Sequence, residues 1–550
     1  MCGIFAVISK NESDRTSPRH DLDHRGPDDF KYDRKGNCHM EFWRLEINGT
    51  KSLASSQPMY YDESLLVCNG EVYNHIELGG ERGESDCAII QPLIASVGIL
   101  ETVQNINGDF AFVWSDGEKF YAARDRVGVR PLFFTELDSG MAFASEAKSL
   151  LHFKTPIMHF PPAHIYDSEL EQFICYDPMY YPSPVNSTSV PDITDNIREK
   201  LINAVKIRMD TSERPIGFFL SGGLDSSIIA AIGAMLSKKA IHTFSIGLEG
   251  QESPDLIAAR KMARHLGSKH TEVTFTVEEG IEALSDVIWH LETYDTTTVR
   301  ASVPMFLLSK YIAEHTDIRV ILSGEGSDEL FGGYLYFHKA PTTDKFMTET
   351  NRLIRDVHLF DVLRADRCTS AHGLELRVPF FDPDFIEYVM DGFSPEVKQP
   401  KDGIEKWILR KSFEDFLPDD ILMRQKNGMS DAVGYSWVDG IKRYADSKFF
   451  WDKCLVNLVS SKPVTSEERL YKSYYREFFP DELVNYMWMP KWTDATDPSA
   501  RYLDNFEDQP DEEEEDDYIF KGRVFIITAG IVLWASIFVS SQISRHIDGR

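Results

Sequence analysis

The chain of 550 residues is longer than one hydrophobic core usually supports, so we expect two domains and a tail. Hydrophobic residues make up 42% and charged residues 27% of the sequence, which is typical of a globular protein. The formal net charge of −30 argues against a nucleic-acid partner, because a basic face is needed to neutralise phosphates.

Seven cysteines are scattered along the chain without a CxxC pair or a Cys/His cluster: Cys2, Cys38, Cys68, Cys87, Cys175, Cys368 and Cys454. This spacing predicts reduced thiols in a reducing compartment, with neither a disulfide framework nor a zinc site. The apolar run 4–8 is too short for a secretory signal, so we expect the folded domains to lie in the cytoplasm.

Residues 1–180 are predicted to form a β-rich domain with a few helices. Short strands are expected at 110–114, 120–123, 132–134 and 141–144, where glycine-containing turns separate apolar runs. The polar, proline-bearing stretch 181–195 is predicted to be a linker.

Residues 196–500 alternate between apolar strands and amphipathic helices. The expected order is helix 197–208, strand 216–220, helix 228–236, strand 241–246, helix 255–266 and strand 319–322, with mostly helical structure over 344–490. This alternation predicts a doubly wound parallel sheet with helical additions. The fold class is therefore predicted to be α/β and α+β, in two domains.

The segment IGFFLSGGLDSSIIAA places a loop rich in glycine and serine between an apolar strand and a helix. Glycines let backbone N–H groups approach an anion, while hydroxyls and a helix N-terminus favour phosphate. The loop residues are Ser221, Gly222, Gly223, Asp225, Ser226 and Ser227. Bare phosphates would repel Asp225, so a role as Mg²⁺ ligand suits it better. The alternative is a serine-capped turn that binds nothing.

A second loop follows another apolar strand, in RVILSGEGSDELFGG. It contains Ser323, Gly324, Glu325 and Asp328. In a doubly wound sheet, two loops at the carboxyl ends of strands can converge on one ligand.

Together with these loops, the segments ETYDTTTVRASVPM, LELRVPFFD and RQKNGMSDAVGYSW resemble the motifs of glutamine-dependent asparagine synthetases of the B type. The similarity runs from residue 1 to about residue 501 and implies an ATP pyrophosphatase domain that uses ATP and Mg²⁺. The implied roles are adenosine contact for Phe219 and Ile246, ATP contact for Ser323 and Gly324, Mg²⁺ binding for Asp225 and Asp328, formation of β-aspartyl-AMP for Glu325 and Lys426, and aspartate binding for Thr297, Thr298 and Arg300.

The first 150 residues resemble the class II glutamine amidotransferase domain through MCGIF, HRGPD at 24–28, NGEVYN at 69–74, Ser85-Asp86 and ARDRVGVRPLFF. That family is an N-terminal-nucleophile hydrolase with an αββα sandwich. The resemblance implies that Cys2 is the nucleophile once Met1 is removed, because its free α-amino group titrates near neutrality and can take the thiol proton. The bland alternative for Cys2 is an ordinary small buried residue.

The remaining glutamine-site roles are also implied by this resemblance. Asn69 and the Gly70 N–H would stabilise the oxyanion. Arg44 would pair with the substrate carboxylate and Asp86 with its ammonium group. The other residues implied to bind glutamine are Leu45, Glu46, Ile47, Asn48 and Glu71.

Three departures from the family pattern lie around Arg44. The run Leu45-Glu46-Ile47-Asn48-Gly49 replaces a Ser-Ile-Val-Asp-like sequence, and Phe42-Trp43 replaces a more polar pair. Asp23 stands where arginine usually precedes HRGPD. None of these changes removes a catalytic atom.

The predicted function is ATP-dependent synthesis of asparagine from aspartate, with glutamine as the ammonia donor and AMP, pyrophosphate and glutamate as products. One alternative is a β-lactam-forming synthetase, which would share the nucleotide loops but lack a competent glutaminase. Another is a catalytically inactive synthetase that serves as a membrane-recruited scaffold. The family resemblance also implies a possible homodimer.

The C-terminal tail carries two further signals. Residues 501–520 include DQPDEEEEDD, a run too charged to fold, which predicts a solvated tether. The segment VFIITAGIVLWASIFVSSQI has no charge over 20 residues, enough for a helix to cross a hydrocarbon core. We therefore predict a transmembrane anchor over 521–544, flanked by cations, with a buried or amphipathic helix as the alternative.

Overall fold

The computed structural model describes residues 1–49, 55–178, 189–250, 253–425, 434–448 and 465–479, together with 483, 486–495 and 497–498. Met1–Leu503 pack as one unit. Lys426, most of the predicted linker, and the acidic and apolar segments of the tail lie outside the described residues. Within those residues, no helix is long and apolar enough to cross a membrane.

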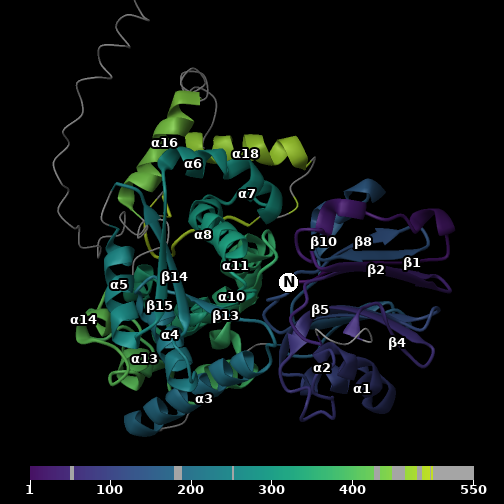
Figure 1. Ribbon diagram of the computed structural model, residues 1–550, viewed down its shortest axis with the longest axis horizontal. Helices are drawn as coiled ribbons and strands as arrows, with labels where there is room; N and C mark the ends of the chain where they lie inside the picture. Colours follow the sequence, from purple (N-terminus) through teal and green to yellow (C-terminus); the bar gives the residue numbers. More distant parts are fainter. Residues whose placement is uncertain are drawn as a thin grey trace, which may run out of the picture. The chain divides into compact units, whose positions relative to one another are not determined.

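Two six-stranded antiparallel sheets form the N-terminal domain (Figure 1). The first runs in the order β10 (Ile157–His159), β8 (Phe133–Leu137), β9 (Gly140–Ala144), β1 (Gly3–Ser9), β3 (Cys38–Arg44) and β2 (Asp29–Lys35). The second runs in the order β12 (Gln172–Cys175), β11 (His164–Asp167), β7 (Phe120–Arg124), β6 (Gly108–Ser115), β5 (Ser64–Val72) and β4 (Met59–Tyr61). The strands predicted near residues 112, 121, 133 and 142 are confirmed as β6 to β9.

Strand β1 is buried on both faces, which explains why its sequence is apolar without alternation. Ile4 and Ile8 join the core between the two sheets. Phe5 and Val7 join a second cluster on the outer face, where η2 (Arg19–Leu22) and η5 (Ala147–Phe153) pack.

The opposite outer face is covered by α1 (Ile90–Val97) and α2 (Ile99–Asn105), with η4 (Asp86–Ile89) leading into α1. The predicted αββα sandwich is thus present. Its fourth layer is built from 3-10 helices instead of α-helices.

The second domain is built on a five-stranded parallel sheet in the order β15 (Lys269–Phe275), β14 (His242–Leu248), β13 (Ile216–Phe219), β16 (Val320–Leu322) and β17 (Glu375–Arg377). The chain runs from β13 outward to β15 and then returns to the other side of β13. The strand order therefore switches direction between β13 and β16, which is where doubly wound sheets bind ligands. The predicted parallel sheet is confirmed.

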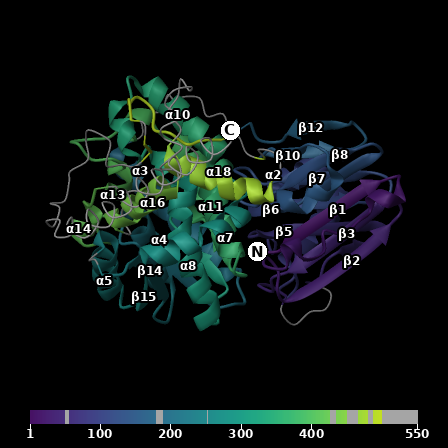
Figure 2. The ribbon, with the colours of Figure 1, turned by 90° about the horizontal axis from the view of Figure 1, so that it is seen from above.

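Helices α4 (Leu224–Leu236), α5 (Pro254–Leu266) and α8 (Thr296–His315) contact the strands of this sheet (Figure 2). The remaining helices before β17 are α6 (Val277–Glu282), α7 (Leu284–Leu291), α9 (Ser327–Phe331), η6 (Leu335–Lys339), α10 (Thr343–Asp356), η7 (Val357–Leu359) and α11 (Asp361–Ser370). Those after it are η8 (Pro379–Phe381), α12 (Pro383–Asp391), η9 (Pro395–Val397), α13 (Trp407–Ser412), α14 (Asp419–Leu422), α16 (Tyr435–Lys448) and α18 (Ser466–Phe478), while η1 (Glu12–Asp14) lies near the N-terminus.

Helix α3 (Val190–Asp210) begins seven residues before the predicted start at 197, inside the stretch expected to be a linker. The Ser189 side chain accepts a hydrogen bond from the Asp192 backbone N–H, and Pro191 stands in the first turn. Both are ordinary signals of a helix start. The polar composition of the preceding stretch hid them.

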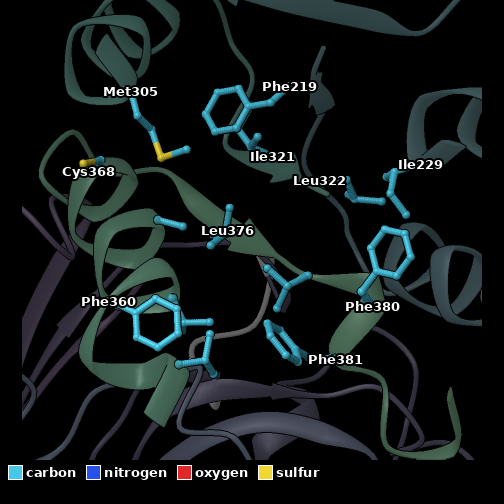
Figure 3. Close-up of a cluster of buried hydrophobic side chains, with 14 of the residues drawn as sticks. Phe219, Ile229, Met305, Ile321, Leu322, Phe360, Cys368, Leu376, Phe380 and Phe381 are labelled. Atoms are coloured by element: carbon cyan, nitrogen blue, oxygen red, sulfur yellow. The ribbon is translucent and has the colours of Figure 1, made fainter. Parts of the chain in front are cut away.

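The hydrophobic core of the second domain surrounds β16 and β17: Ile321 and Leu376 lie on the side of Met305 and Cys368, whereas Leu322 lies beside Ile229 of α4 (Figure 3). The same cluster extends into the N-terminal domain through Leu45, Ile47, Val127 and Val129. The two domains therefore share one continuous apolar core, and the segment after Arg44 lies at their junction.

Candidate active sites

Cys2 is half-buried at the entry to β1. Its Sγ accepts a hydrogen bond from the Leu45 N–H at 3.4 Å and donates to the Leu45 carbonyl at 3.6 Å. Burial raises the pKa of this thiol to about 11, so a nearby base is needed to form the thiolate. Burial also lowers the pKa of the Met1 α-amino group to about 6, because the charged form loses its hydration.

Asn69 and Gly70 lie in β5, on the second sheet. The Asn69 Nδ2 atom is buried and has no hydrogen-bond partner among the described residues. Gly70 is closely packed: a Cβ there would lie 2.4 Å from the Asp109 carbonyl oxygen. A buried amide donor without a partner is rare in native proteins and indicates a place for a ligand acceptor.

The segment after Arg44 folds back on that side chain. Arg44 Nη2 donates to the carbonyls of Asn48 and Gly49, each at 3.1 Å. Asn48 Nδ2 donates to Glu71 Oε2 at 2.6 Å and to Asp86 Oδ1 at 3.4 Å. The predicted glutamine-site residues from both sheets are thus joined by direct hydrogen bonds.

Asp86 is fixed by the Val72 N–H, which donates to its Oδ2 at 2.5 Å. Burial raises the pKa of this carboxyl. The pKa of Glu71 is raised further, first by burial and then by the charge of Asp86, while Arg377 of the second domain opposes the rise at 3.0 Å. The pocket therefore holds two close carboxyl groups that resist ionising together.

Two of the departures from the family pattern are partners in the structure. Trp43 Nε1 donates to Asp23 Oδ1 at 2.9 Å, which braces the segment before HRGPD against β3. Gly26 of that motif passes so close to β3 that a Cβ would lie 2.2 Å from the Trp43 carbonyl. The hydrogen bond gives the unusual aspartate and the unusual tryptophan a common physical reason.

Arg25 links Cys2 to the second domain, a role that sequence reasoning missed. Its Nε donates to the Cys2 carbonyl at 3.0 Å. Its Nη1 donates to Glu146 Oε1 at 2.8 Å and to Asp366 Oδ2 of α11 at 3.0 Å. Arg25 and Asp366 are separated by more than 300 residues, so no local sequence signal could pair them.

The two predicted nucleotide loops do converge, because β13 and β16 are neighbours. A Cβ on Gly324 would lie 2.8 Å from the Ser226 backbone nitrogen, so only glycine allows this approach. Gly222 has a φ of +73°, and a Cβ there would lie 2.5 Å from Ala258 of α5. Both glycines serve close backbone packing.

The hydroxyls of the first loop form a local network at the start of α4. The Ser221 and Ser226 hydroxyls lie 3.0 Å apart, and the Gly223 N–H donates to Ser221 Oγ at 3.2 Å. The Ser227 hydroxyl is buried and has no partner among the described residues. Phe219 and Ile246 stand on the adjacent strands β13 and β14, at 8% and 7% exposure.

Asp225 and Asp328 are brought together and share one partner. Lys406 Nζ lies 2.8 Å from Asp225 Oδ2 and 2.6 Å from Asp328 Oδ1. Two carboxylates beside a phosphate-type loop are oxygen donors of the kind that Mg²⁺ prefers, so the residues present fit that ion. Lys406 was not foreseen in the sequence.

Of the described residues expected to act on aspartate, some have hydrogen-bond or ion-pair partners in the protein and one hydroxyl has none. Arg364 of α11 lies 3.4 Å from Glu325 Oε1. Asp295 caps α8: its Oδ2 accepts hydrogen bonds from the Thr298 N–H at 2.8 Å and from the Thr298 hydroxyl at 2.7 Å. The Thr297 Oγ1 atom is buried without a partner among the described residues.

Arg300 is held by protein carboxylates. Its Nε donates to Glu467 Oε1 at 2.5 Å and its Nη1 to Asp497 Oδ1 at 2.9 Å. Its assignment to aspartate stays a prediction, and so does that of Lys426, which lies outside the described residues.

Two family models match the chain. The model described as glutamine amidotransferase domain matches residues 1–181, and the one described as asparagine synthase matches residues 196–353 and 341–495. Relatives named "Asparagine synthetase [glutamine-hydrolyzing]" share 41% identity in Homo sapiens and 40% in Gallus gallus, each over 92% of this chain and 99% of the relative. This chain belongs to the asparagine synthetase family. The relative of that name in Asparagus officinalis is 39% identical over 91% of this chain and 92% of its own length, so the family likeness spans both domains.

Proposed function

We propose that the chain is a glutamine-hydrolysing asparagine synthetase. The observation that carries this proposal is the pair of hydrogen bonds that Arg25 donates, one to the Cys2 carbonyl and one to Asp366 of the second domain. A glutamine-dependent synthetase needs its ammonia-producing site to be held against its ATP-using site. An independent hydrolase or ligase would gain nothing from such a buried link.

In the N-terminal domain, Cys2 is the nucleophile after Met1 is removed. Its α-amino group takes the thiol proton, the thiolate attacks the glutamine amide carbon, and the proton leaves with ammonia. Asn69 Nδ2 and the Gly70 N–H stabilise the tetrahedral oxyanion. Water then releases glutamate from the thioester. Arg44 binds the substrate carboxylate and Asp86 its ammonium group.

In the second domain, an oxygen of the aspartate side-chain carboxylate attacks the α-phosphorus of ATP, and pyrophosphate leaves. Ammonia attacks the carbonyl carbon of β-aspartyl-AMP, and AMP leaves as asparagine forms. Asp225 and Asp328 would hold Mg²⁺, which neutralises phosphate charge when bound. The loop from Ser221 to Ser227 binds the phosphates.

Glu325, steered by Arg364, stands beside the reacting carboxylate and supports formation of the adenylate together with Lys426. Thr297, whose buried hydroxyl has no partner among the described residues, binds aspartate together with Thr298 and Arg300. Phe219 and Ile246 provide the apolar contact for adenosine.

The test is an assay of the purified full chain for asparagine and AMP formed from aspartate, ATP and either glutamine or ammonium salt. The Cys2→Ala variant should lose glutamine-dependent synthesis, by at least 10²-fold, and keep ammonium-dependent synthesis. Equal loss of both activities in a folded variant would contradict the assignment. A β-lactam-forming enzyme or an inactive scaffold would produce no asparagine from either nitrogen source.

We also propose that the catalytic domains lie in the cytoplasm and that residues 521–544 anchor them to a membrane. The proposal rests on the 20 uncharged residues 524–543 and on the cations that flank them. The full chain should resist alkaline extraction from membranes, whereas a chain that ends at Asp517 should be extracted. Recovery of the full chain in the aqueous fraction without detergent would contradict the proposed anchor.

A further inference from the structure

Lys406 occupies the space between the two carboxylates assigned to the metal. Its Nζ donates to both oxygens of Asp225, each at 2.8 Å, and lies 2.6 Å from Asp328 Oδ1. Ser327 Oγ accepts a fourth, longer bond at 3.4 Å. The ammonium group therefore already contacts the oxygens that would ligate Mg²⁺.

The position of Lys406 is built into the fold. The side chain is 2% exposed. Lys406 precedes α13 with a φ of +55°, a left-handed conformation that costs most residues about 1 kcal/mol or more. Its neighbour Glu405 is held by an ion pair with Arg410. Such strain persists only where the surroundings enforce it, and it tends to occur at functional sites.

Gly333 makes room for this lysine. A Cβ at that position would lie 1.9 Å from Lys406 Cε and 2.1 Å from Asp328 Oδ1. The absence of a side chain at Gly333 therefore leaves room for Lys406 to reach two acidic groups on different loops.

The electrostatics of this arrangement make Lys406 and a metal ion competitors. An ammonium group and a divalent cation on the same two carboxylates repel each other at a separation of about 4 Å, and the repulsion is strong in a buried site. Phosphate oxygens would change this balance, because their negative charge can accept the ammonium group while the metal takes the carboxylates.

We propose that Lys406 holds Asp225 and Asp328 in place of the metal, so that the site takes a divalent cation only together with the phosphates of ATP. This inference rests on the proposed function, which assigns the two carboxylates to Mg²⁺. Its consequence is an order of binding: free metal alone binds weakly, and nucleotide is required to draw Lys406 away from the carboxylates.

The test measures Mn²⁺ binding to the full chain by electron paramagnetic resonance, with and without α,β-methylene-ATP. The wild-type chain should bind Mn²⁺ weakly alone and much more tightly with the nucleotide analogue. Lys406→Met should tighten Mn²⁺ binding without nucleotide by at least tenfold, and Asp225→Asn in the same chain should abolish that gain. Lys411→Met, on the exposed side of the same helix, is the matched control and should change nothing.

The outcomes separate the inference from the function on which it rests. Nucleotide-free Mn²⁺ binding that is equally tight in the wild-type chain and in Lys406→Met would overturn the inference alone. Absence of Mn²⁺ binding in every chain, even with the analogue, would overturn the metal assignment itself. The melting temperature of each variant, read by circular dichroism, identifies any loss that comes from misfolding.

Discussion

The pocket around Cys2 and the nucleotide loops after β13 and β16 differ in the charge of their most buried functional groups. In the first, the buried amide donor of Asn69 is left without a partner among the described residues. In the second, the carboxylates of Asp225 and Asp328 both form ion pairs with Lys406.

Free energy explains the contrast. A neutral buried amide without a partner costs about 1–3 kcal/mol, which a folded domain can bear. A buried charge without compensation costs about 3–5 kcal/mol or more, so two neighbouring buried carboxylates need a counter-charge. The neutral amide donor of Asn69 is therefore left open, whereas the two carboxylates share a buried counter-charge.

The largest effect that tests this contrast is expected from Asn69→Ala. Loss of an oxyanion donor should lower the glutaminase kcat by about 10²- to 10³-fold. Because the donor has no protein partner among the described residues, the melting temperature should not fall through lost hydrogen bonding. Steady-state glutamate release measures the effect on activity, and thermal melting measures the effect on stability.

Asn74→Ala is the matched control for that variant. Its Nδ2 donates to the Asn105 carbonyl and its Oδ1 accepts from the Asn107 N–H, so both ends of the amide are engaged. This change should lower stability by about 1 kcal/mol and leave glutaminase chemistry in place. If Asn69→Ala lost stability and kept activity while Asn74→Ala lost activity and kept stability, the distinction between an amide without a protein partner and a hydrogen-bonded amide would be wrong.

Asp366→Asn should produce the next largest effect, by breaking the charge pair with Arg25 between the domains. Breaking such a buried pair destabilises by about 3 kcal/mol. Since Arg25 also holds the Cys2 carbonyl, glutamine-dependent kcat/KM should fall about tenfold while ammonium-dependent synthesis falls less. The measurement is the ratio of glutamine-dependent to ammonium-dependent synthesis. Asp356→Asn, near the surface on α10, is the control and should leave this ratio unchanged.

A pH effect follows from the raised pKa of Asp86. Its protonated form carries no charge to pair with the glutamine ammonium group. As the pH falls through that raised pKa, KM for glutamine should rise by up to about tenfold per pH unit. KM for ammonium salt, corrected for its free-base fraction, should not follow this curve, and a shared curve would point to a cause elsewhere.

The smallest effect concerns Lys398, a buried lysine that contacts no carboxylate in the described residues, in contrast to Lys406. Its Nζ donates to the Val389 carbonyl at 3.1 Å, and burial lowers its pKa to about 7. Between that pH and about 10.5, the unfolded chain binds a proton that the folded chain does not, so stability should rise with pH. In Lys398→Met this rise should vanish, which would appear as a difference of a few degrees in melting temperature between pH 7 and 10.

Local patterns predicted the sheets and both nucleotide loops, because apolar runs, turns and SGGLDSS are read within a few residues. What they missed depends on distant partners. Lys406 lies 181 residues from Asp225, and the Arg25 to Asp366 pair spans 341 residues. The early start of α3 is different, because its signals at Ser189 and Pro191 are local and could have been found.

The burial of Met1 sets an order of events in biosynthesis. Its side chain is 1% exposed, and its amino group donates to the Leu374 carbonyl of the second domain at 3.3 Å. An aminopeptidase needs an accessible chain end, which the finished fold withholds. Under the proposed function, which requires a free Cys2 amino group, Met1 would have to be cleaved before the second domain docks, because a fully folded chain would keep Met1 out of reach of the peptidase.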